Sequence, residues 1–459
     1  MGKQRYILAI VLFVIGLFSL FVRGSYVNVI IIDDRYKEIS LNSDSYGYIH
    51  LAQNIANLKC YAQNSIYSRY LSILRTPGYP LFYALFEYFG TAPVSVLWSQ
   101  VLIGTCIPVL NALLAFMITK KLSASIIAGF LSSISTTSIF LTGEIMVDLL
   151  FAVVFMIGFF LLYYGIAHLK QKSILAAGLV FGISSLIKPT TIIWPFYSII
   201  VYYFLSKASK VNIRYDILIL FVTVQIAIIG GWSLRNLYTE NIFALSTIGT
   251  QTLRHYLAVE VVEVGEKKNS HRTIINSIKR EQNRLRRELQ SALNTGISIK
   301  KLHDSQFNES LNIFFSNLYL TYICYKNNVS ENINGTDLWR FYSEKLPKKS
   351  FLYKLLPFLT YFNNNFLKII CIIILLLVFG LPWFRKLDEN ELLKHYFYIS
   401  LALSLTFLYF ALISGITFWT GPRIVYPAEF TLVLLSVIIG HCFFYFVSLI
   451  LHKPKLNST

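Results

Sequence analysis

Ionisable residues stand at the ends of several long apolar stretches of this sequence, where they could do chemistry at the edge of a lipid bilayer. An ionisable side chain at membrane depth is costly unless it faces a cavity or a partner. These residues come from six parts of the chain, and we expect the fold to gather them in one cavity at the external membrane boundary. They are Asp44, Glu87, Glu144, Asp148, Lys188, Arg235 and Arg423.

Three of the acidic residues could act as a base or as ligands. Asp44 either caps the helix that follows it or, as a general base, takes a proton from an attacking hydroxyl. Glu144 and Asp148 are four residues apart, so on a helix they would share one face. They then position an acceptor or orient the base, hold a divalent metal together with Asp44, or simply begin the helix, where acids favour its dipole.

The basic residues at the same level could bind phosphate. Arg grips a phosphate group in bidentate fashion, whereas Lys acts as a point charge. Lys188, Arg235 and Arg423 therefore either hold the phosphate of a lipid substrate or extend to the membrane headgroups. A further cation, Arg75, opens the string Arg-Thr-Pro-Gly-Tyr-Pro at residues 75–80, which we expect to stop any helix before apolar residues 81–89 resume as a short re-entrant piece.

The order of these residues is similar to that in the GT-C glycosyltransferases, and more narrowly in the protein O-mannosyltransferase and aminoarabinose transferase group (family 39-like). The similarity covers roughly residues 1–240 and the last two apolar stretches, and residues 75–80 are its most specific element. Residues 250–360 match nothing in that group. The matching positions are Asp44-x-Tyr46, Arg75 to Pro80, Glu144, Lys188-Pro189-Thr190, Trp232-x-x-Arg235-Asn236 and Arg423-x-x-x-Pro427.

The resemblance implies a membrane enzyme that moves a sugar from a polyprenyl-phosphate donor to an acceptor hydroxyl on the extracytoplasmic face, inverting the anomeric centre. The acceptor is a glycan, a lipid or a protein. No cofactor is obligatory in this scheme, although a divalent metal could take part.

Residue roles follow from the same resemblance. Asp44 matches the catalytic base and Glu144 the acidic residue of the second external loop. Many relatives have two adjacent acids in the first loop, whereas here Ser45 follows Asp44 and Asp33-Asp34 lies ten residues earlier, so an alternative base remains. The cations expected at the donor phosphate are Arg235, Arg75, Lys188 and Arg423. The residues expected at the acceptor or sugar are Tyr46, Asp148 and Tyr79.

Composition agrees with a membrane protein. Apolar residues make up 55% of the 459 residues, charged residues only 14%, and the mean hydropathy is +0.57. The net charge of +18 could suggest nucleic acid as a partner, but about half of the basic excess lies in short connections that would meet anionic lipid. We therefore expect membrane lipids as partners and no nucleic acid.

Hydropathy predicts an all-α polytopic protein with about ten transmembrane helices, since each needs about 20 apolar residues. Lys and Arg concentrate in alternate short connections and at both termini, whereas the other short connections contain only Lys188 and Arg423. This asymmetry predicts a multi-pass cell-membrane protein with cytoplasmic termini. The predicted spans are 5–22, 94–118, 123–141, 146–168, 173–187, 190–206, 214–233, 366–384, 396–416 and 424–450.

The spans divide the chain into a catalytic transmembrane module at 1–235, an external and largely helical region at 236–365, and C-terminal transmembrane helices at 366–459. The first external loop, 24–93, contains two predicted surface helices, Asp44–Leu58 and Ile66–Leu74. In the external region, His271–Asn294 predicts a basic amphipathic helix that either packs on the protein or contacts lipid phosphate or an anionic acceptor.

Cys60 and Cys324 both fall in these external regions and either pair or remain free thiols. Two other classes of protein share the general pattern. A polysaccharide polymerase or ligase would also act on lipid-linked glycans with external Arg and acidic residues. A lipid or sugar transporter would have a similar number of spans, but we expect repeated halves and midplane charges in that class, and the sequence has neither.

Overall fold

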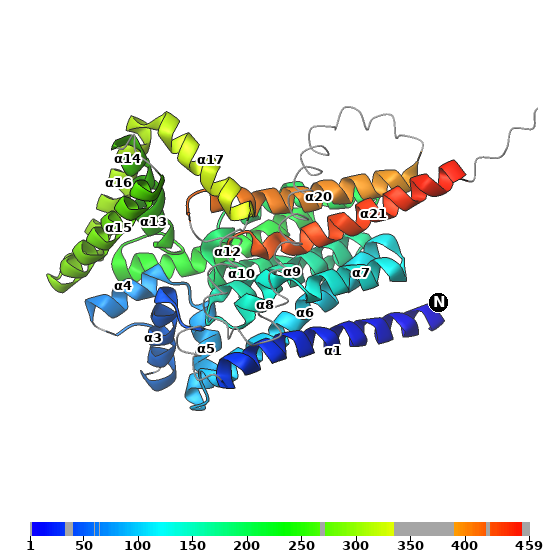
Figure 1. Cartoon of the computed structure of the whole chain (residues 1–459), viewed down its shortest axis with the longest axis horizontal. Helices are drawn as coiled ribbons and strands as arrows, with labels where there is room; N and C mark the ends of the chain where they lie inside the picture. Colours follow the sequence, from blue (N-terminus) through cyan, green and yellow to red (C-terminus); the bar gives the residue numbers. More distant parts are fainter. Residues whose placement is uncertain are drawn as a thin grey trace, which may run out of the picture.

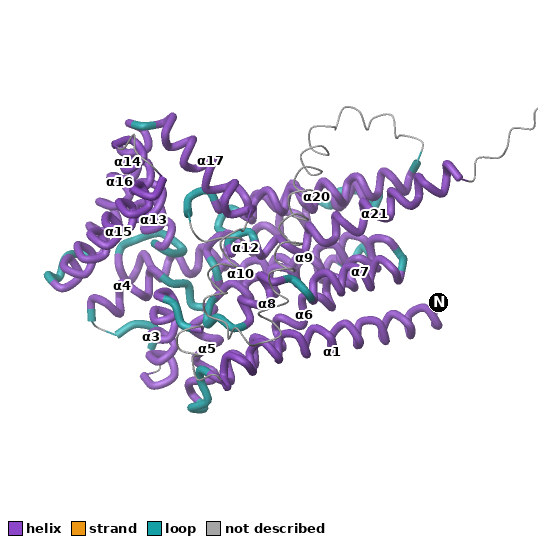
Figure 2. Tube along the Cα trace, viewed as in Figure 1, coloured by secondary structure: helices purple, strands orange, loops and turns teal. Residues whose placement is uncertain are grey.

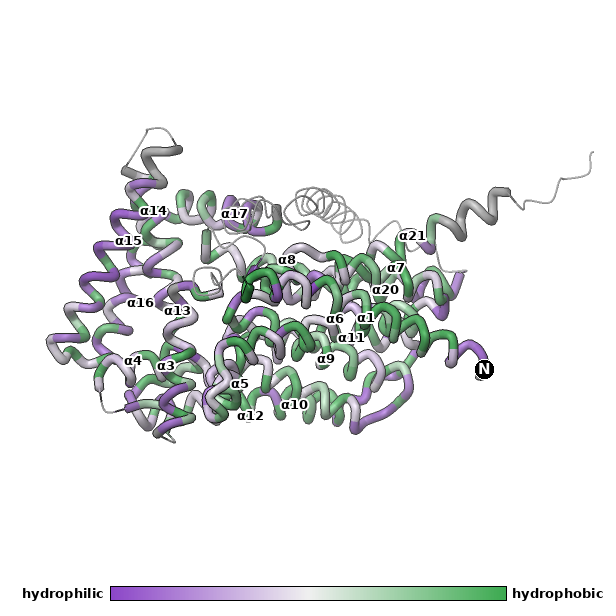
Figure 3. The backbone as a smooth tube through the Cα atoms, turned by 60° about the horizontal axis from the view of Figure 1, so that its bottom comes forward, coloured by the Kyte–Doolittle hydropathy of each residue, from purple (hydrophilic) through white to green (hydrophobic). Residues whose placement is uncertain are grey.

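The computed structural model describes residues 2–32, 40–58, 60–63, 65–266, 271–334, 390–418 and 423–451. Every regular element within these ranges is a helix (Figure 2). A long bundle of apolar helices forms one part of the molecule, and shorter, more polar helices gather at one end of it (Figures 1 and 3). The predicted all-helical class is confirmed for the described residues.

Among the described residues, six helices are long and apolar enough to cross a membrane, and a bent pair raises the number to seven. The bent pair is α7 (Leu122–Ser133) and α8 (Thr136–Thr142), with an angle of 52° between them. These helices indicate a membrane-embedded protein. The six are α1 (Gly2–Ile32), α6 (Val94–Thr119), α9 (Val147–Ala167), α12 (Tyr215–Glu240), α20 (Glu391–Ser414) and α21 (Glu429–Leu451).

The described residues do not show the ten predicted spans. Two predicted spans appear as the shorter helices α10 (Gln171–Ile187) and α11 (Trp194–Ala208), of 17 and 15 residues. At about 1.5 Å per residue, neither covers the roughly 30 Å of a hydrocarbon core alone. The predicted span 366–384 lies outside the described residues.

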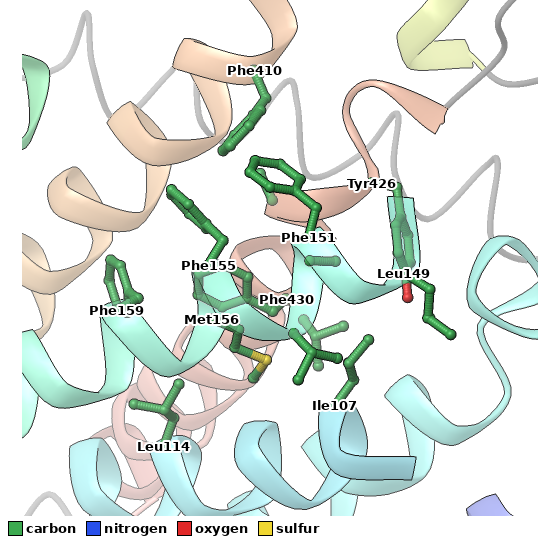
Figure 4. Packing of buried hydrophobic residues seen from close by; sticks show 14 of the residues in the cluster. Ile107, Leu114, Leu149, Phe151, Phe155, Met156, Phe159, Phe410, Tyr426 and Phe430 are labelled. Atoms are coloured by element: carbon green, nitrogen blue, oxygen red, sulfur yellow. The ribbon is translucent and has the colours of Figure 1, made fainter. Parts of the chain in front are cut away.

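An aromatic cluster stabilises the centre of the bundle. The ring of Phe155 on α9 lies 4.8 Å from Trp194, 5.0 Å from Phe410 and 5.2 Å from Phe181, between ring centroids. Figure 4 shows Phe155 and Phe410 facing each other across two helices. Gly158 makes this packing possible, because a Cβ atom there would come within 2.8 Å of the Phe181 ring. Close approach at small residues is the usual way in which membrane helices pack.

A second buried feature ties α1 to the rest of the bundle. Arg23 is fully buried, and its guanidinium donates to Ser19 Oγ (2.6 Å) and Ser138 Oγ (2.7 Å). Tyr426 Oη also donates to Ser138 Oγ (2.9 Å), so α1, α8 and the turn before α21 meet at one hydroxyl. We predicted the first span to end at Val22, but α1 continues to Ile32 because Arg23 finds these partners inside the protein.

The first loop folds into α3 (Ser43–Leu58), α4 (Ile66–Leu74) and α5 (Gly78–Tyr88), which confirms the two predicted helices. The predicted helix stop at residues 75–80 is wrong in its extent. The chain breaks only over Arg75–Pro77, and α5 begins at Gly78 because Pro80 falls in its first turn, where no hydrogen-bonded N–H is needed.

Gly78 explains why the string 75–80 needs a glycine. A Cβ atom at Gly78 would lie 2.6 Å from the Ile187 side chain and 2.9 Å from its Cα atom. Thr76 Oγ1 donates to the Ile187 carbonyl at 2.9 Å. The string therefore docks directly on the end of α10, immediately before Lys188.

The helices after α12 cap the same end of the bundle (Figure 1). Hydrogen bonds fix this cap to the first loop, since Thr247 N donates to the Ile73 carbonyl (3.0 Å) and Ser246 Oγ to the Leu74 carbonyl (2.5 Å). Cys60 and Cys324 are both free, so the alternative of a disulfide is wrong. The cap contains α13 (Ile248–Thr252), the π-helix η2 (Leu253–Ala258), α14 (Val259–Glu266), α15 (His271–Asn294), α16 (Ile299–Ser316) and α17 (Leu318–Asn334).

Glu260 in this cap gives a pH-dependent stability. Burial raises the pKa of Glu260 to about 7, against the opposing hydrogen bond from Asn328 Nδ2 (2.8 Å). The folded state then binds a proton that the unfolded chain has lost, so stability falls as the pH rises from about 4.5 to about 7, by at most about 1.4 kcal/mol per pH unit. We expect Glu260→Gln to remove this dependence in thermal unfolding of the detergent-solubilised protein at pH 5 and pH 8. The exposed Glu288→Gln is the control, and equal pH dependence in all three proteins would contradict the assignment.

Candidate functional site

Asp44 lies in the first turn of α3 but does not cap it. Asn42 Oδ1 accepts hydrogen bonds from the backbone N–H groups of Asp44 (3.0 Å) and Ser45 (3.2 Å), which is the capping arrangement. Ser45 Oγ donates to the Ile145 carbonyl at 2.9 Å and fixes the helix start against the segment before α9. The carboxylate of Asp44 is therefore available for other contacts.

Ion pairs link Asp44 to residues from four distant parts of the chain. Arg75 Nη2 lies 2.8 Å from Asp44 Oδ1, and Arg423 Nη2 lies 3.4 Å from Asp44 Oδ2. Arg423 also reaches Asp148, with 2.7 Å between Nε and Oδ2, and Lys188 Nζ lies 2.6 Å from Asp148 Oδ1. These five residues, called here the acid–cation cluster, contain two acids and three cations.

Exposure varies across the acid–cation cluster. The side chain of Asp148 is fully buried, those of Arg75 and Lys188 are about one-tenth exposed at 10% and 11%, and those of Arg423 and Asp44 are 26% and 37% exposed. A ligand therefore meets Asp44 and Arg423 first. The buried Asp148 forms ion pairs with Lys188 and Arg423 and so fixes the positions of these two cations.

The cations keep Asp44 ionised. Burial alone would raise the pKa of Asp44, but Arg75 and Arg423 together hold it well below its usual value. Burial also lowers the pKa of Lys188, against the opposing charge of Asp148. A carboxylate with so low a pKa is a weak base, because efficient general bases titrate near the working pH. Any ligand that draws Arg75 and Arg423 away from Asp44 would raise its pKa and its basicity.

Aromatic residues hold Arg75 in place. Its guanidinium lies 4.8 Å from the centroid of the Tyr48 ring, and Arg75 Nη1 donates to Tyr48 Oη at 3.3 Å. Tyr61 Oη donates to the Arg75 carbonyl at 2.9 Å. Tyr48 was missed in the sequence, although it lies four residues after Asp44 and therefore on the same helical face.

Glu144 and Asp148 do not share a helical face, so that prediction is wrong. Met146 is extended, with φ −145° and ψ 158°, and α9 begins only at Val147. Glu144 lies in the turn before the helix, is buried, and its carbonyl accepts from Gln100 Nε2 at 2.8 Å. Asp148 does lie in the first turn, as the dipole interpretation required, but it also holds Lys188 and Arg423.

The remaining predicted residues lie outside the acid–cation cluster. Tyr79 is fully buried and donates to Gln100 Oε1 at 2.9 Å, so it supports the site rather than lining an opening. Tyr46 is 61% exposed on α3 and makes no hydrogen bond to the cluster among the described residues. Glu87 on α5 accepts a hydrogen bond from Gln53 at 3.3 Å.

Arg235 lies near the cluster without joining it. Its guanidinium lies 5.2 Å from the Trp232 ring and 5.5 Å from the Tyr61 ring, and Nη1 donates to Asn236 Oδ1 at 2.9 Å. Tyr61 separates Arg235 from Arg75, whose carbonyl it binds. Tyr61 therefore contacts both arginines, and among the described residues Arg235 forms no ion pair with the acid–cation cluster.

Tyr256 is a further candidate that the sequence did not indicate. It lies on the π-helix η2, packs against Phe418 with 5.3 Å between ring centroids, and is partly exposed. Burial raises the pKa of Tyr256, and the charges of Asp44, Arg286, Arg423 and Arg75 act on it to a smaller extent. Single π-turns within helices occur frequently at functional sites.

The described residues do not offer a preformed metal centre: none of their His, Cys, Asp and Glu side chains form a group of three or more that could hold an ion. The carboxylates of Asp44 and Asp148 instead face Arg and Lys. No protein-family model, curated protein or solved structure matches the chain. The chemistry of the site therefore has to be argued from its own geometry.

Proposed function

We propose that this protein is a membrane glycosyltransferase that moves a sugar from a polyprenyl-phosphate donor to an acceptor hydroxyl on the extracytoplasmic face, with inversion. The observation that supports it most is the position of Asp44, a half-open carboxylate between Arg75 and Arg423 at the end of an apolar bundle. A base beside several cations suits attack at a carbon whose leaving group is an anionic phosphate.

The donor phosphate would take over the guanidinium groups that now hold Asp44. Arg423 is the more accessible of the two, at 26% exposed, Arg75 is only 10% exposed, and Lys188 is paired with Asp148. As these cations turn to the phosphate, the pKa of Asp44 rises towards its ordinary range. The arriving donor thus converts a paired carboxylate into a working base.

The transfer balances without an added cofactor. Asp44 accepts the proton of the acceptor hydroxyl, the acceptor oxygen forms a bond to the anomeric carbon, and the bond from that carbon to the phosphate oxygen breaks. The electron pair leaves with the polyprenyl phosphate, whose charge the cations balance. Contacts of the prenyl chain along the bundle would hold the reacting carbon in line.

A transfer assay tests the proposal. The purified protein is given synthetic polyprenyl-phosphate sugars, and release of polyprenyl phosphate is measured with and without candidate glycan, lipid and protein acceptors. Release that depends on an acceptor supports a single-sugar transferase. Turnover only with a pyrophosphate-linked oligomer would favour a polysaccharide polymerase or ligase, and movement of intact donor across a bilayer would favour a transporter.

Arg235 gives a second test of donor binding. If its guanidinium grips the donor phosphate from its place between Tyr61 and Trp232, Arg235→Ala raises the donor KM by about tenfold and changes kcat less. Arg235→Lys keeps the charge but loses the contact of the planar guanidinium with the two aromatic rings. It serves as the conservative comparison. An unchanged KM in both variants would show that Arg235 only anchors the end of α12.

A further inference from the structure

The helix α15 uses its apolar side within the protein. Ile278 and Leu285 pack with Val259 and Phe418, and Leu293 joins the cluster that contains Leu51. The stripe that predicted an amphipathic helix is therefore buried against α14 and the first loop. It is not available to lie in the acyl chains of a membrane, so the opposite, basic face is the one that meets the surroundings.

That basic face lines a groove. Between α14 and α15 lies an open cleft of about 490 Å³, whose walls include Arg280, Arg284 and Arg287. These arginines are spaced by four and three residues, so they lie in one row along the helix. The exposed cations in and beside the row are Lys279, Arg280, Arg284, Arg286 and Arg287.

The acidic residues of α15 hold only the middle arginine. Arg284 Nε lies 2.8 Å from Glu281 Oε2, and Arg284 Nη1 lies 2.8 Å from Glu288 Oε1. Within the part of the chain that the structure describes, Arg280 and Arg287 have no acidic partner. Their seven-residue separation places them roughly 10 Å apart along the helix axis. Arg280 donates only long hydrogen bonds to its own helix, from Nε to the Asn276 carbonyl (3.4 Å) and from Nη2 to Ser277 Oγ (3.5 Å). Two exposed guanidinium groups without a carboxylate, at that distance, suit a ligand with repeated negative charges.

The place of the groove favours a partner from the aqueous phase. The helices α14, α15 and α16 lie beyond the end of the apolar bundle, and α15, which supplies most of the groove, is largely hydrophilic (Figures 1 and 3). Ser277 and Asn283 add polar groups to the walls beside the arginines, and the walls also contain two acids, Glu263 and Glu281, of which Glu281 is paired with Arg284. Arg binds phosphate and carboxylate groups through paired hydrogen bonds, and side-chain amides and hydroxyls suit the oxygens of sugars.

We propose that the groove between α14 and α15 docks a linear polyanionic glycan, a polymer that carries phosphate or carboxylate groups along its length. If the proposed function also holds, this polymer is the acceptor, and the groove binds it on the cap, which is hydrogen-bonded to the first loop that carries Asp44 and Arg75. Binding at the groove itself does not require sugar transfer.

A binding experiment with the full chain tests this inference. The protein is placed in nanodiscs of neutral lipid, and fluorescence anisotropy follows labelled polygalacturonate and labelled polyphosphate. We expect Arg280→Gln/Arg287→Gln to weaken binding of both probes by about tenfold or more. The matched control is Lys300→Gln/Lys301→Gln, which removes the same charge from exposed residues of α16 and should leave binding within about twofold.

Three results would overturn the inference. Unchanged binding in the arginine variant would show that the groove is not used, and equal losses in both variants would show only general attraction to a basic protein. Loss of binding to vesicles of anionic lipid, with polymer binding intact, would assign the face to the membrane surface. Because the readout is binding, a groove that holds the polymer in a protein without turnover would contradict the proposed function and not this inference.

Discussion

Replacing Asp44 with asparagine should lower the turnover of sugar transfer by about a hundredfold or more, with the donor KM changed much less. Asparagine has nearly the same shape but cannot accept the proton of the acceptor hydroxyl. Arg75 retains its contacts with Tyr48, so its place does not depend on the lost charge. The measurement is the rate of polyprenyl-phosphate release at saturating donor and acceptor.

Glu87→Gln is the matched control for this experiment, because Glu87 lies on α5 of the same first loop but is bonded to Gln53, outside the acid–cation cluster. Full activity of the control with loss in Asp44→Asn would assign the base to this one carboxylate. Full activity of Asp44→Asn would remove it from that role. The acids at Asp33 and Asp34, which lie outside the described residues, would then be the next candidates.

Much of the acid–cation cluster was foreseeable, and the physical reason is the cost of burying charge. Asp148, Lys188 and Arg423 end or begin apolar helices, so each needed a partner, and few partners exist at that depth. Asp44 and Arg75 fall in the loop that caps the same end. The sequence therefore indicated several of the side chains that meet, but it wrongly added Glu87, Glu144 and Arg235 and did not show which pairs form.

Backbone geometry explains why the position of Glu144 could not be predicted from the sequence. Its four-residue spacing from Asp148 predicts a shared face only if the helix has already begun, and the extended Met146 delays that start to Val147. The residue types of Met146 and Val147 do not indicate where the helix begins. The same limit applies to α10 and α11, whose apolar sequences look like spans although their helices end early.

Tertiary contacts explain the other surprises. Arg23 gave no sign of being a core residue, since a basic group after an apolar run ordinarily marks a membrane boundary. It is buried because Ser19 and Ser138 accept its hydrogen bonds from two helices. Tyr256 comes from a region without any recognisable pattern, and its packing on Phe418 depends on a tertiary contact that the sequence does not reveal.

Replacing Arg423 with glutamine should lower kcat/KM by about 100-fold to 1,000-fold, the usual effect of removing one group that stabilises developing charge. Arg423 is the only member of the acid–cation cluster that bonds both acids, Asp44 and Asp148. Lysine at this position keeps the charge but lacks the several N–H donors of a guanidinium that bind two carboxylates at once. We therefore expect Arg423→Lys to recover only part of the activity.

The pH profile separates a chemical role of Arg423 from a structural one. Since Arg423 helps to hold the pKa of Asp44 below its usual value, Arg423→Gln lets that pKa rise, and the acid limb of the kcat/KM profile moves to higher pH. A merely structural role would reduce the amount of folded enzyme and leave the limb in place. Lys188 still pairs with the buried Asp148 in this variant, so that acid is not left without a cation. Arg423→Lys keeps a positive charge near Asp44 and should leave the limb close to its wild-type position. An unshifted limb in Arg423→Gln would show that Arg423 does not act on the base, because its charge would then be absent without effect on Asp44.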